Sequence, residues 1–377
     1  MKTQTQTFNH LLPIDFDTIS TLPESHAWSW SSTASPLDDP CHLPVNDDKS
    51  LLPIIDIGKP GAYDLMRHAC KKWGAFQVIN HGVPLNLFSE IELQARRLFS
   101  LPMEQKHLVA RPPSGIVGYG SHRIASFFPK LMWSEGYRMM GSPVENARKL
   151  WPQDHAKFWY EHYFTCFPTL ASASCQILFS RIPSHFEVME QWQAEMKILI
   201  EKIVSMMLGS LGLTHEEDMQ WFEPKNGCDR AQCVLQLNSY PMCPDPDRAM
   251  GLAPHTDSSL ITLLYQGNIN GLQVYKDGEG WVAIEPIEGA LVVNLGDLMQ
   301  IVSNGRFKTV LHRAVVNKTH HHVSTAFFYM PPWDAKVLPL RKLVDSDHPP
   351  LYRSLMWKEY LEIKKNDFSK ALESIRF

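Results

Sequence analysis

Three side chains of types that commonly bind metals lie in the second half of the chain, two of them only two residues apart. The segment "GLAPHTDSSLITLLYQ" holds His255 and Asp257 two residues apart, and His312 follows in "LHRAVVN". On a β-strand, residues i and i+2 point to the same face, so the imidazole and the carboxylate would converge on one point. Two histidines and one carboxylate form the facial triad that holds non-haem Fe(II) and leaves coordination positions open for a cosubstrate and dioxygen.

The His-x-Asp pattern also has a plain alternative, because it occurs in strands that bind no metal. The third histidine, His312, lies on another predicted short strand of the same region and favours the metal site. We therefore predict that His255, Asp257 and His312 are both the metal ligands and the catalytic centre.

The elements that would position these residues are short strands. From Cys233 onward, runs of alternating apolar residues are separated by turn signals, and "YKDGEGWV" predicts a hairpin with glycine in its turn. Many short strands at a spacing of roughly 8–12 residues predict a sandwich or a jelly-roll barrel and not a βαβ parallel sheet. Apolar residues at helical spacing predict helices over 62–74, 86–102, 188–212 and 352–375. The fold class is thus mainly β with flanking helices.

Bulk properties exclude several classes of protein. The 377 residues include 44% hydrophobic and 20% charged residues, and the net charge is −4, which gives no electrostatic case for nucleic acid or an anionic membrane. No run of about eighteen apolar residues predicts a spanning helix, and the N-terminus lacks the apolar core of a signal peptide. Seven cysteines without a CxxC pair indicate reduced thiols. We expect a cytoplasmic monomer that acts on a small molecule.

Longer motifs resemble a known superfamily. "WGAFQVINHGVP", "LVVNLGDLMQIVSNGRFKTVLHRAVVN" and "STAFFYMPP" resemble the plant Fe(II)/2-oxoglutarate-dependent dioxygenases. Within that superfamily, "IASFFPKLMWSEGYRMMGSP" and "KLWPQDHAKF" are similar to the gibberellin 3-beta-dioxygenases, also called gibberellin 3-oxidases. The resemblance covers roughly residues 50–158 and 188–377.

The resemblance implies a fold, a set of cofactors and a reaction. It implies a double-stranded β-helix (jelly-roll) core with the triad on Fe(II), and it adds 2-oxoglutarate and O2 as cosubstrates and ascorbate as a reductant. Asn238 and Tyr240 would line the 2-oxoglutarate pocket, and the Tyr240 hydroxyl would donate a hydrogen bond to a carboxylate. Ser324 would contact the distal carboxylate of the cosubstrate. The implied reaction is 3-beta-hydroxylation of a gibberellin, the step of gibberellin biosynthesis that makes the plant hormone active.

One residue departs from the family pattern. The family places an arginine ten residues after the distal metal histidine, in the sequence R-x-S, whereas this chain has His322 in "HHHVS". A guanidinium is permanently charged and grips a carboxylate with two parallel hydrogen bonds, while histidine offers one donor and is mostly neutral at cytosolic pH. We therefore expect weak 2-oxoglutarate binding unless the carboxylate itself protonates His322. The neighbouring His320 and His321 either bind a surface metal or belong to a solvated edge.

The predicted organisation contains a second departure, at 158–187. This segment interrupts the family pattern with a mixture of aromatic residues, serine and proline, and it is either translated non-coding sequence, such as a retained intron, or a harmless surface loop. The full division is an irregular N-terminal arm over 1–50, an N-terminal dioxygenase region over 51–157, the anomalous insertion over 158–187, a helical connector over 188–232, the jelly-roll core over 233–335 and a C-terminal helical segment over 336–377.

Two functional alternatives remain open at this point. The chain is either an active gibberellin 3-beta-dioxygenase or a catalytically impaired relative, as His322 and the insertion at 158–187 suggest. An active enzyme would also be compatible with another gibberellin position or another plant metabolite. By charge, the candidates to bind the substrate's carboxylate are Arg123, Lys130 and Arg248. Apolar residues that either wall its pocket or belong to the core are Phe127, Phe128, Trp133, Met139 and Met140.

Overall fold

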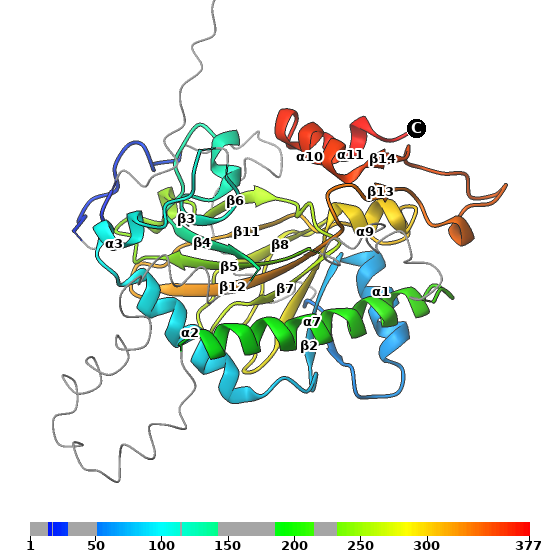
Figure 1. The fold of residues 1–377 in the computed structure, drawn as a ribbon, viewed down its shortest axis with the longest axis horizontal. Coiled ribbons are helices and arrows are strands. Elements are labelled where there is room, and N and C mark those ends of the chain that lie inside the picture. Colours follow the sequence, from blue (N-terminus) through cyan, green and yellow to red (C-terminus); the bar gives the residue numbers. More distant parts are fainter. Residues whose placement is uncertain (1–13, 17, 29–50, 114, 142–184, 215–231) are drawn as a thin grey trace, which may run out of the picture.

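Two β-sheets form the centre of the protein. The computed structural model describes residues 14–16, 18–28, 51–113, 115–141, 185–214 and 232–377 (Figure 1). Within these residues, an eight-stranded sheet has the order β1-β2-β10-β7-β12-β5-β4-β3, and a four-stranded sheet has the order β6-β11-β8-β9. This arrangement confirms the predicted mainly β jelly roll with flanking helices.

Most strands are short, as the turn signals predict, but β5 and β12 span nine residues each. Those of the large sheet are β1 (Ile54–Asp56), β2 (Ala75–Ile79), β3 (Gly118–Gly120), β4 (Glu135–Met140), β5 (Gln232–Tyr240), β7 (Ile261–Tyr265), β10 (Leu291–Leu295) and β12 (His322–Met330). Those of the small sheet are β6 (Leu252–His255), β8 (Leu272–Lys276), β9 (Gly280–Ala283) and β11 (His312–Ala314). A separate pair joins β13 (Lys336–Val337) to β14 (Leu355–Met356). The predicted hairpin is confirmed, because Lys276 of β8 pairs with Gly280 of β9.

The named strand pairs are antiparallel with one exception. Strands β1 and β2 pair in parallel, with α1 (Ala62–Lys72) between them in sequence, so one βαβ unit lies at the edge of an otherwise antiparallel sheet. The helix ends where Gly74 adopts φ +70°, and a Cβ at that position would come within 2.5 Å of the Lys308 carbonyl oxygen. Glycine is therefore required there by both the turn and the close approach.

The two faces of the large sheet have different neighbours. We call inner the face that carries Asn238, Ser324 and Thr262, and outer the opposite face, because side chains alternate along each strand. The outer face packs on α2 (Leu85–Phe99) and α7 (His185–Gly209), which run along one side of the sheet (Figure 1). Apolar residues that join this outer core are Phe88, Trp192, Leu237, Leu263 and Phe327. The inner face meets the small sheet, since Leu264 packs against a cluster containing Leu272 and Val274.

The remaining helices are shorter. They are α3 (Met103–His107), α9 (Asp297–Val302), α10 (Trp357–Asn366) and α11 (Ala371–Ser374), with 3-10 turns η1 (Arg123–Phe127), η4 (Pro246–Arg248) and η5 (Arg341–Leu343). The single helix predicted over 352–375 is wrong: β14 precedes α10, and the chain breaks between α10 and α11 at Asp367, where φ is −138° and ψ is 82°. The helix predicted over 86–102 ends at Phe99. Pro102 cannot continue it and is instead the N-cap of α3. None of the helices described is long and apolar enough to cross a membrane.

Residues 14–16 and 18–28 contact the rest of the protein. The Trp28 backbone N–H donates to the Arg248 carbonyl at 2.9 Å, and the Trp28 indole donates to the Leu131 carbonyl at 3.1 Å. Phe16 meets the fully buried Trp133 edge-on, with ring centroids 5.0 Å apart. The predicted insertion at 158–187 falls outside the described residues, except that the backbone of 185–187 begins α7.

Candidate metal centre

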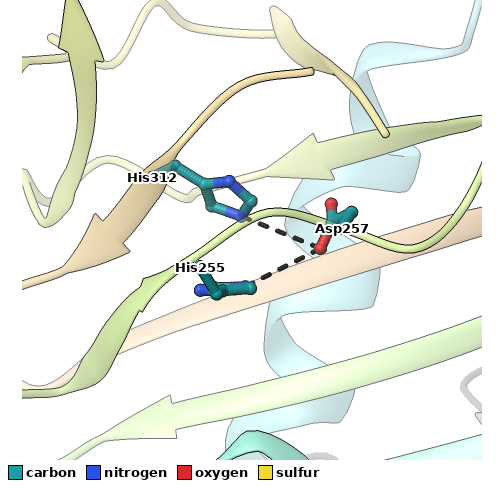
Figure 2. A group of neighbouring side chains, drawn as sticks. All are labelled: His255, Asp257 and His312. Atoms are coloured by element: carbon teal, nitrogen blue, oxygen red, sulfur yellow. Dashed lines mark ion pairs between the residues drawn. The ribbon is translucent and has the colours of Figure 1, made fainter. Parts of the chain in front are cut away.

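Pairing between β6 and β11 brings the three predicted ligands together. His255 and His312 are direct cross-strand partners, and Asp257 follows the end of β6. The Nε2 atoms of His255 and His312 lie 3.7 Å and 3.9 Å from Asp257 Oδ1 (Figure 2). All three side chains are buried, and their donor atoms lie within 4.8 Å of one another. This is the only group of its kind in the described part of the chain.

Hydrogen bonds fix the tautomer of both histidines. His255 Nδ1–H donates to the Ala253 carbonyl at 2.8 Å, and His312 Nδ1–H donates to the Val310 carbonyl at 3.2 Å. Because a carbonyl oxygen only accepts, the proton sits on Nδ1 and the Nε2 lone pair faces the centre of the triad. Histidine ligands in metalloproteins are oriented in this way. The donor set therefore fits a divalent metal ion.

The carboxylate of the triad is held ionised. Burial opposes its charge, but the neighbouring His312 and His255 and a hydrogen bond from Thr262 together lower the pKa of Asp257 below its ordinary value. Thr262 Oγ1–H donates to Asp257 Oδ2 at 2.7 Å, which leaves Oδ1 directed at the histidines. For His255, burial and the charge of His312 lower the pKa, so the neutral, metal-binding form is favoured.

A buried ion pair supports the loop between the two sequence-adjacent ligands. Lys364 of α10 forms an ion pair with Asp297 of α9 and donates to the Thr256 carbonyl at 2.7 Å and to its hydroxyl at 2.9 Å. The Asp297 backbone N–H donates to the Asp257 carbonyl at 2.8 Å, and the Tyr360 hydroxyl donates to Asp297 Oδ2 at 2.7 Å. Sequence reasoning missed these residues, because nothing local in "LEIKKND" indicates a partner at Thr256.

The four residues expected around 2-oxoglutarate are neighbours on the inner face. His322 pairs with Tyr240 and Ser324 pairs with Asn238 across β12 and β5. Asn238 Nδ2 donates to Ser324 Oγ at 3.0 Å, and a hydrogen bond with Ser324 partly offsets the burial that raises the pKa of Tyr240. The Tyr240 and His322 rings stack, with centroids 5.1 Å apart and planes at 22°. These four side chains form a compact buried cluster, which is the expected cosubstrate pocket.

His322 contributes no cation to this pocket. Its Nε2–H donates to the Gln266 carbonyl at 2.6 Å, and burial lowers the pKa of His322 to about 4. Its Nδ1 is buried without a hydrogen-bond partner, and a Cβ on Gly271 would approach that atom to 2.7 Å. The ring is therefore neutral, with its one proton committed to the backbone and a bare lone pair on the other nitrogen. Such a ring cannot replace an arginine opposite a carboxylate.

The other two histidines of the run point elsewhere. His321 Nε2 lies 2.9 Å from Ser239 Oγ on the outer face, and the exposed His320 contacts Thr319. No metal-binding group within the described residues includes either of them, which supports the solvated-edge interpretation over a surface metal site.

One pocket residue has no signal in the sequence. His122, in the turn after β3, is buried, and its Nε2–H donates to Asn238 Oδ1 at 2.9 Å. Its ring lies parallel to that of Tyr240, at 8° and a centroid distance of 6.4 Å. His122 therefore fixes the orientation of the Asn238 amide, although only the folded chain brings the two together.

Two of the residues proposed by charge alone are engaged at the surface. Lys130 Nζ donates to the Glu24 carbonyl at 2.7 Å, and Arg248 lies 3.5 Å from Glu24 and 3.6 Å from Asp245. Of the apolar candidates, Trp133 and Met139 belong to the hydrophobic core, and Phe127 stacks on Phe368 at 4.5 Å.

Comparison with known proteins agrees with this geometry. Residues 231–331 match the model of the 2OG-Fe(II) oxygenase superfamily, and residues 52–162 match that of the non-haem dioxygenase in morphine synthesis N-terminal family. Gibberellin 3-beta-dioxygenase 3 of Arabidopsis thaliana is 45% identical over 375 residues, which cover 98% of this chain and 95% of the relative. Gibberellin 3-beta-dioxygenase 1 of Pisum sativum is 44% identical over 368 residues, which cover 98% of this chain and 90% of the relative.

Solved structures show the same fold. The crystal structure of JOX2 in complex with 2OG, Fe and JA superposes with a TM-score of 0.75 at 29% identity, covering 96% of this chain and 95% of that chain. The rice dioxygenase for auxin oxidation gives a TM-score of 0.65 at 25% identity, and the match covers 86% of this chain and 100% of the rice chain.

Proposed function

Because the chain belongs to the 2OG-Fe(II) oxygenase superfamily, and within it to the gibberellin 3-beta-dioxygenases, we propose that it hydroxylates gibberellins at the 3β position. The observation that carries this function is the 45% identity to a gibberellin 3-beta-dioxygenase over nearly the whole of both chains. The cosubstrates are 2-oxoglutarate and O2, the metal is Fe(II), and ascorbate serves as the reductant. The product is a bioactive 3β-hydroxylated gibberellin.

The metal site follows from the protonation of the triad. His255 and His312 bind Fe(II) through Nε2, and Asp257 binds through Oδ1, since these atoms face one another and the opposite atoms hold hydrogen bonds. Bound Fe(II), 2-oxoglutarate and O2 supply the oxidising power: a C–H bond of the substrate becomes C–OH while 2-oxoglutarate becomes succinate and CO2. The chain's own part is to keep the His255 imidazole neutral, the Asp257 carboxylate ionised and bulk water outside.

The cosubstrate pocket is formed by Asn238, Tyr240, Ser324 and the position of His322. We expect the hydroxyls of Tyr240 and Ser324, which hydrogen-bond to each other, to donate to the distal carboxylate once it is bound. His122 keeps the Asn238 amide in place. His322 contributes least to binding this carboxylate, because its one proton is donated to the Gln266 carbonyl. The pocket therefore binds 2-oxoglutarate through neutral donors from the chain.

Turnover of the full chain tests the function. The protein is incubated with Fe(II), ascorbate, 2-oxoglutarate and a nineteen-carbon gibberellin, and the product is identified by mass spectrometry. We expect 3β-hydroxylated gibberellin from the native chain and none above background from Asp257→Ala. The matched control is Asp277→Ala, which removes an exposed carboxylate paired with Lys308 and leaves the triad untouched.

Other products would redirect the assignment. Hydroxylation at another gibberellin carbon would keep the enzyme class and change its regiochemistry. Succinate release without any gibberellin product would point to another plant metabolite. Absence of both, at 2-oxoglutarate concentrations that saturate related enzymes, would favour the catalytically impaired relative, an alternative that the comparisons do not favour.

We further propose that the protein is a cytoplasmic monomer. Supporting this are the moderate negative charge and the cysteines that form no CxxC pair. Light scattering coupled to gel filtration should give the mass of one chain, and a fluorescent fusion should fill the cytoplasm. A mass of two chains, or signal confined to an organelle, would overturn the respective part.

A further inference from the structure

Strand β4 places an arginine on the inner face of the large sheet. Glu135, Tyr137 and Met139 alternate with Gly136 and Arg138 along this strand. Arg138 pairs with Gln236, and Gly136 pairs with Asn238, so both face the interior that holds the triad and the cosubstrate pocket.

The guanidinium of Arg138 has no anionic partner. Among the described residues it makes no hydrogen bond and no ion pair, and its Nε is buried without an acceptor. The guanidinium lies over the Phe328 ring, whose centroid is 5.2 Å from Cζ. Arg111 differs, since it donates to the Ser121 carbonyl at 2.8 Å, and Arg96 is paired with Glu92. An arginine enclosed without a partner is costly unless a ligand completes the site.

The charged groups around Arg138 favour binding of an anionic ligand. Burial lowers the pKa of Arg138 to about 9, and the positive charges of Arg123 and Arg111 add to this, while Asp257 opposes it. The group stays charged at neutral pH. Among the described residues, Asp257 is the carboxylate that acts on Arg138, and it faces the two histidines of the triad. Glu362 acts on Arg123, so its charge does not balance that of Arg138.

Arg138 lies one inward-facing row beyond the residues expected around the cosubstrate carboxylate. The row Arg138–Gln236–Ala326 lies two residues along β12 from the row Asn238–Ser324 and four residues from the row Tyr240–His322, or about 7 Å and about 13 Å at the usual rise of a strand. Phe328, on the same face, adds an apolar wall beside the guanidinium. A flat hydrocarbon skeleton that ends in a carboxylate matches this combination of surfaces.

We propose that Arg138 binds the carboxylate of the gibberellin and so determines which carbon of the substrate faces the metal. This inference rests on the proposed function and adds to it a specificity-determining residue. Arg138 acts by binding and orienting the substrate and takes no part in the oxidation.

The test compares a carboxylic acid with its methyl ester. Equilibrium dialysis with Co(II) in place of Fe(II) and saturating 2-oxoglutarate measures binding of a nineteen-carbon gibberellin and of its ester. We expect the native chain to bind the acid roughly 30-fold or more tightly than the ester, the range for a buried charge-assisted contact. Arg138→Gln should lose this preference and bind both equally weakly, and Arg138→Lys should fall between. Arg353→Gln, which removes an exposed arginine paired with Glu359, should behave as the native chain.

The outcomes separate this inference from the function. If the native chain binds acid and ester alike, Arg138 does not hold the carboxylate, whatever the variants do. If Arg138→Gln weakens 2-oxoglutarate instead of the gibberellin, Arg138 substitutes for the arginine that His322 replaces, and the inference is wrong. In either case 3β-hydroxylation by the native chain still stands. If the native chain neither binds nor hydroxylates any gibberellin, both proposals fail. The ester comparison needs no variant. Equal binding of acid and ester by the native chain therefore refutes the inference even if Arg138→Gln does not fold.

Discussion

At the scale of single residues, His322 occupies the position of a cation without acting as one. Its ring is held by the Gln266 carbonyl on one side, by Tyr240 on its face and by Gly271 against its free nitrogen. These contacts make it a packed, neutral residue. We therefore propose that the hydroxyls of Tyr240 and Ser324 hold the carboxylate that an arginine would otherwise bind.

Replacing His322 by arginine tests this interpretation. We expect His322→Arg to tighten 2-oxoglutarate binding by about 30-fold or more, because it restores a charge-assisted, two-point contact. Calorimetric titration of the Co(II) form with 2-oxoglutarate measures the change. His320→Arg is the control, since it adds the same charge at an exposed position of the same run. Equal affinity for native and His322→Arg would show that His322 does not limit the cosubstrate.

The buried histidines also set a pH dependence. Burial lowers the pKa of His122 and of His322 from 6.5 to about 4. Between these values the unfolded chain binds more protons than the folded one, so stability is complete above about pH 6.5 and falls as the pH drops toward 4, by at most ~1.4 kcal/mol per pH unit for each histidine. Urea unfolding at pH 7.5 and 5.0 should show a lower midpoint in acid. His322→Gln should reduce that difference, and an unchanged difference would contradict the buried, neutral state of His322.

At the scale of elements, the C-terminal helix α10 supports the metal loop through one side chain. Lys364→Met should lower the free energy of unfolding by about 3–5 kcal/mol, because it leaves the Asp297 carboxylate buried and unpaired. Metal affinity should fall as well, since Thr256 loses both of its hydrogen bonds to the ammonium. Chemical denaturation and metal titration measure the two effects.

The adjacent lysine supplies the control. Lys365 lies on the same helix, is 67% exposed and pairs with Glu362 at 3.7 Å, so Lys365→Met should change stability by no more than about 0.5 kcal/mol. Equal effects of the two substitutions would mean that α10 does not brace the loop.

The elements also show what a sequence can and cannot predict. The sequence pattern identified the three residues of the triad, and β11 pairs His312 with His255 as expected. The strand periodicity assumed for Asp257 was wrong, because β6 ends at His255 and the carboxylate lies just beyond the strand. Lys364 and His122 could not be found, because their partners Thr256 and Asn238 lie far away in the sequence and no local pattern records the contact. The break in the helix predicted over 352–375 was missed for a similar reason: apolar spacing continues through a segment where tertiary packing divides the helix.

At the scale of the whole molecule, residues 14–16 and 18–28 cover side chains that would otherwise be exposed. Removing residues 1–28 should expose Trp133, which Phe16 and His26 now cover, and should lower stability by on the order of 3 kcal/mol. Tryptophan emission should shift to the red, and the urea midpoint should fall. A truncation of residues 1–13 keeps each of these contacts and serves as the control. If both truncations behave as the full chain, the covering segment contributes nothing to stability.

The central strand of the large sheet is also one of the last to be synthesised. Strand β12 lies between β5 and β7, yet both neighbours precede it in the chain. A ribosome therefore releases two strands whose facing edges have no partner until residues 322–330 emerge, and open edges pair readily with other chains. Any message that ends before codon 322 leaves those edges permanently exposed. The cell then loses the enzyme and also gains an aggregation-prone fragment that its quality-control machinery has to remove.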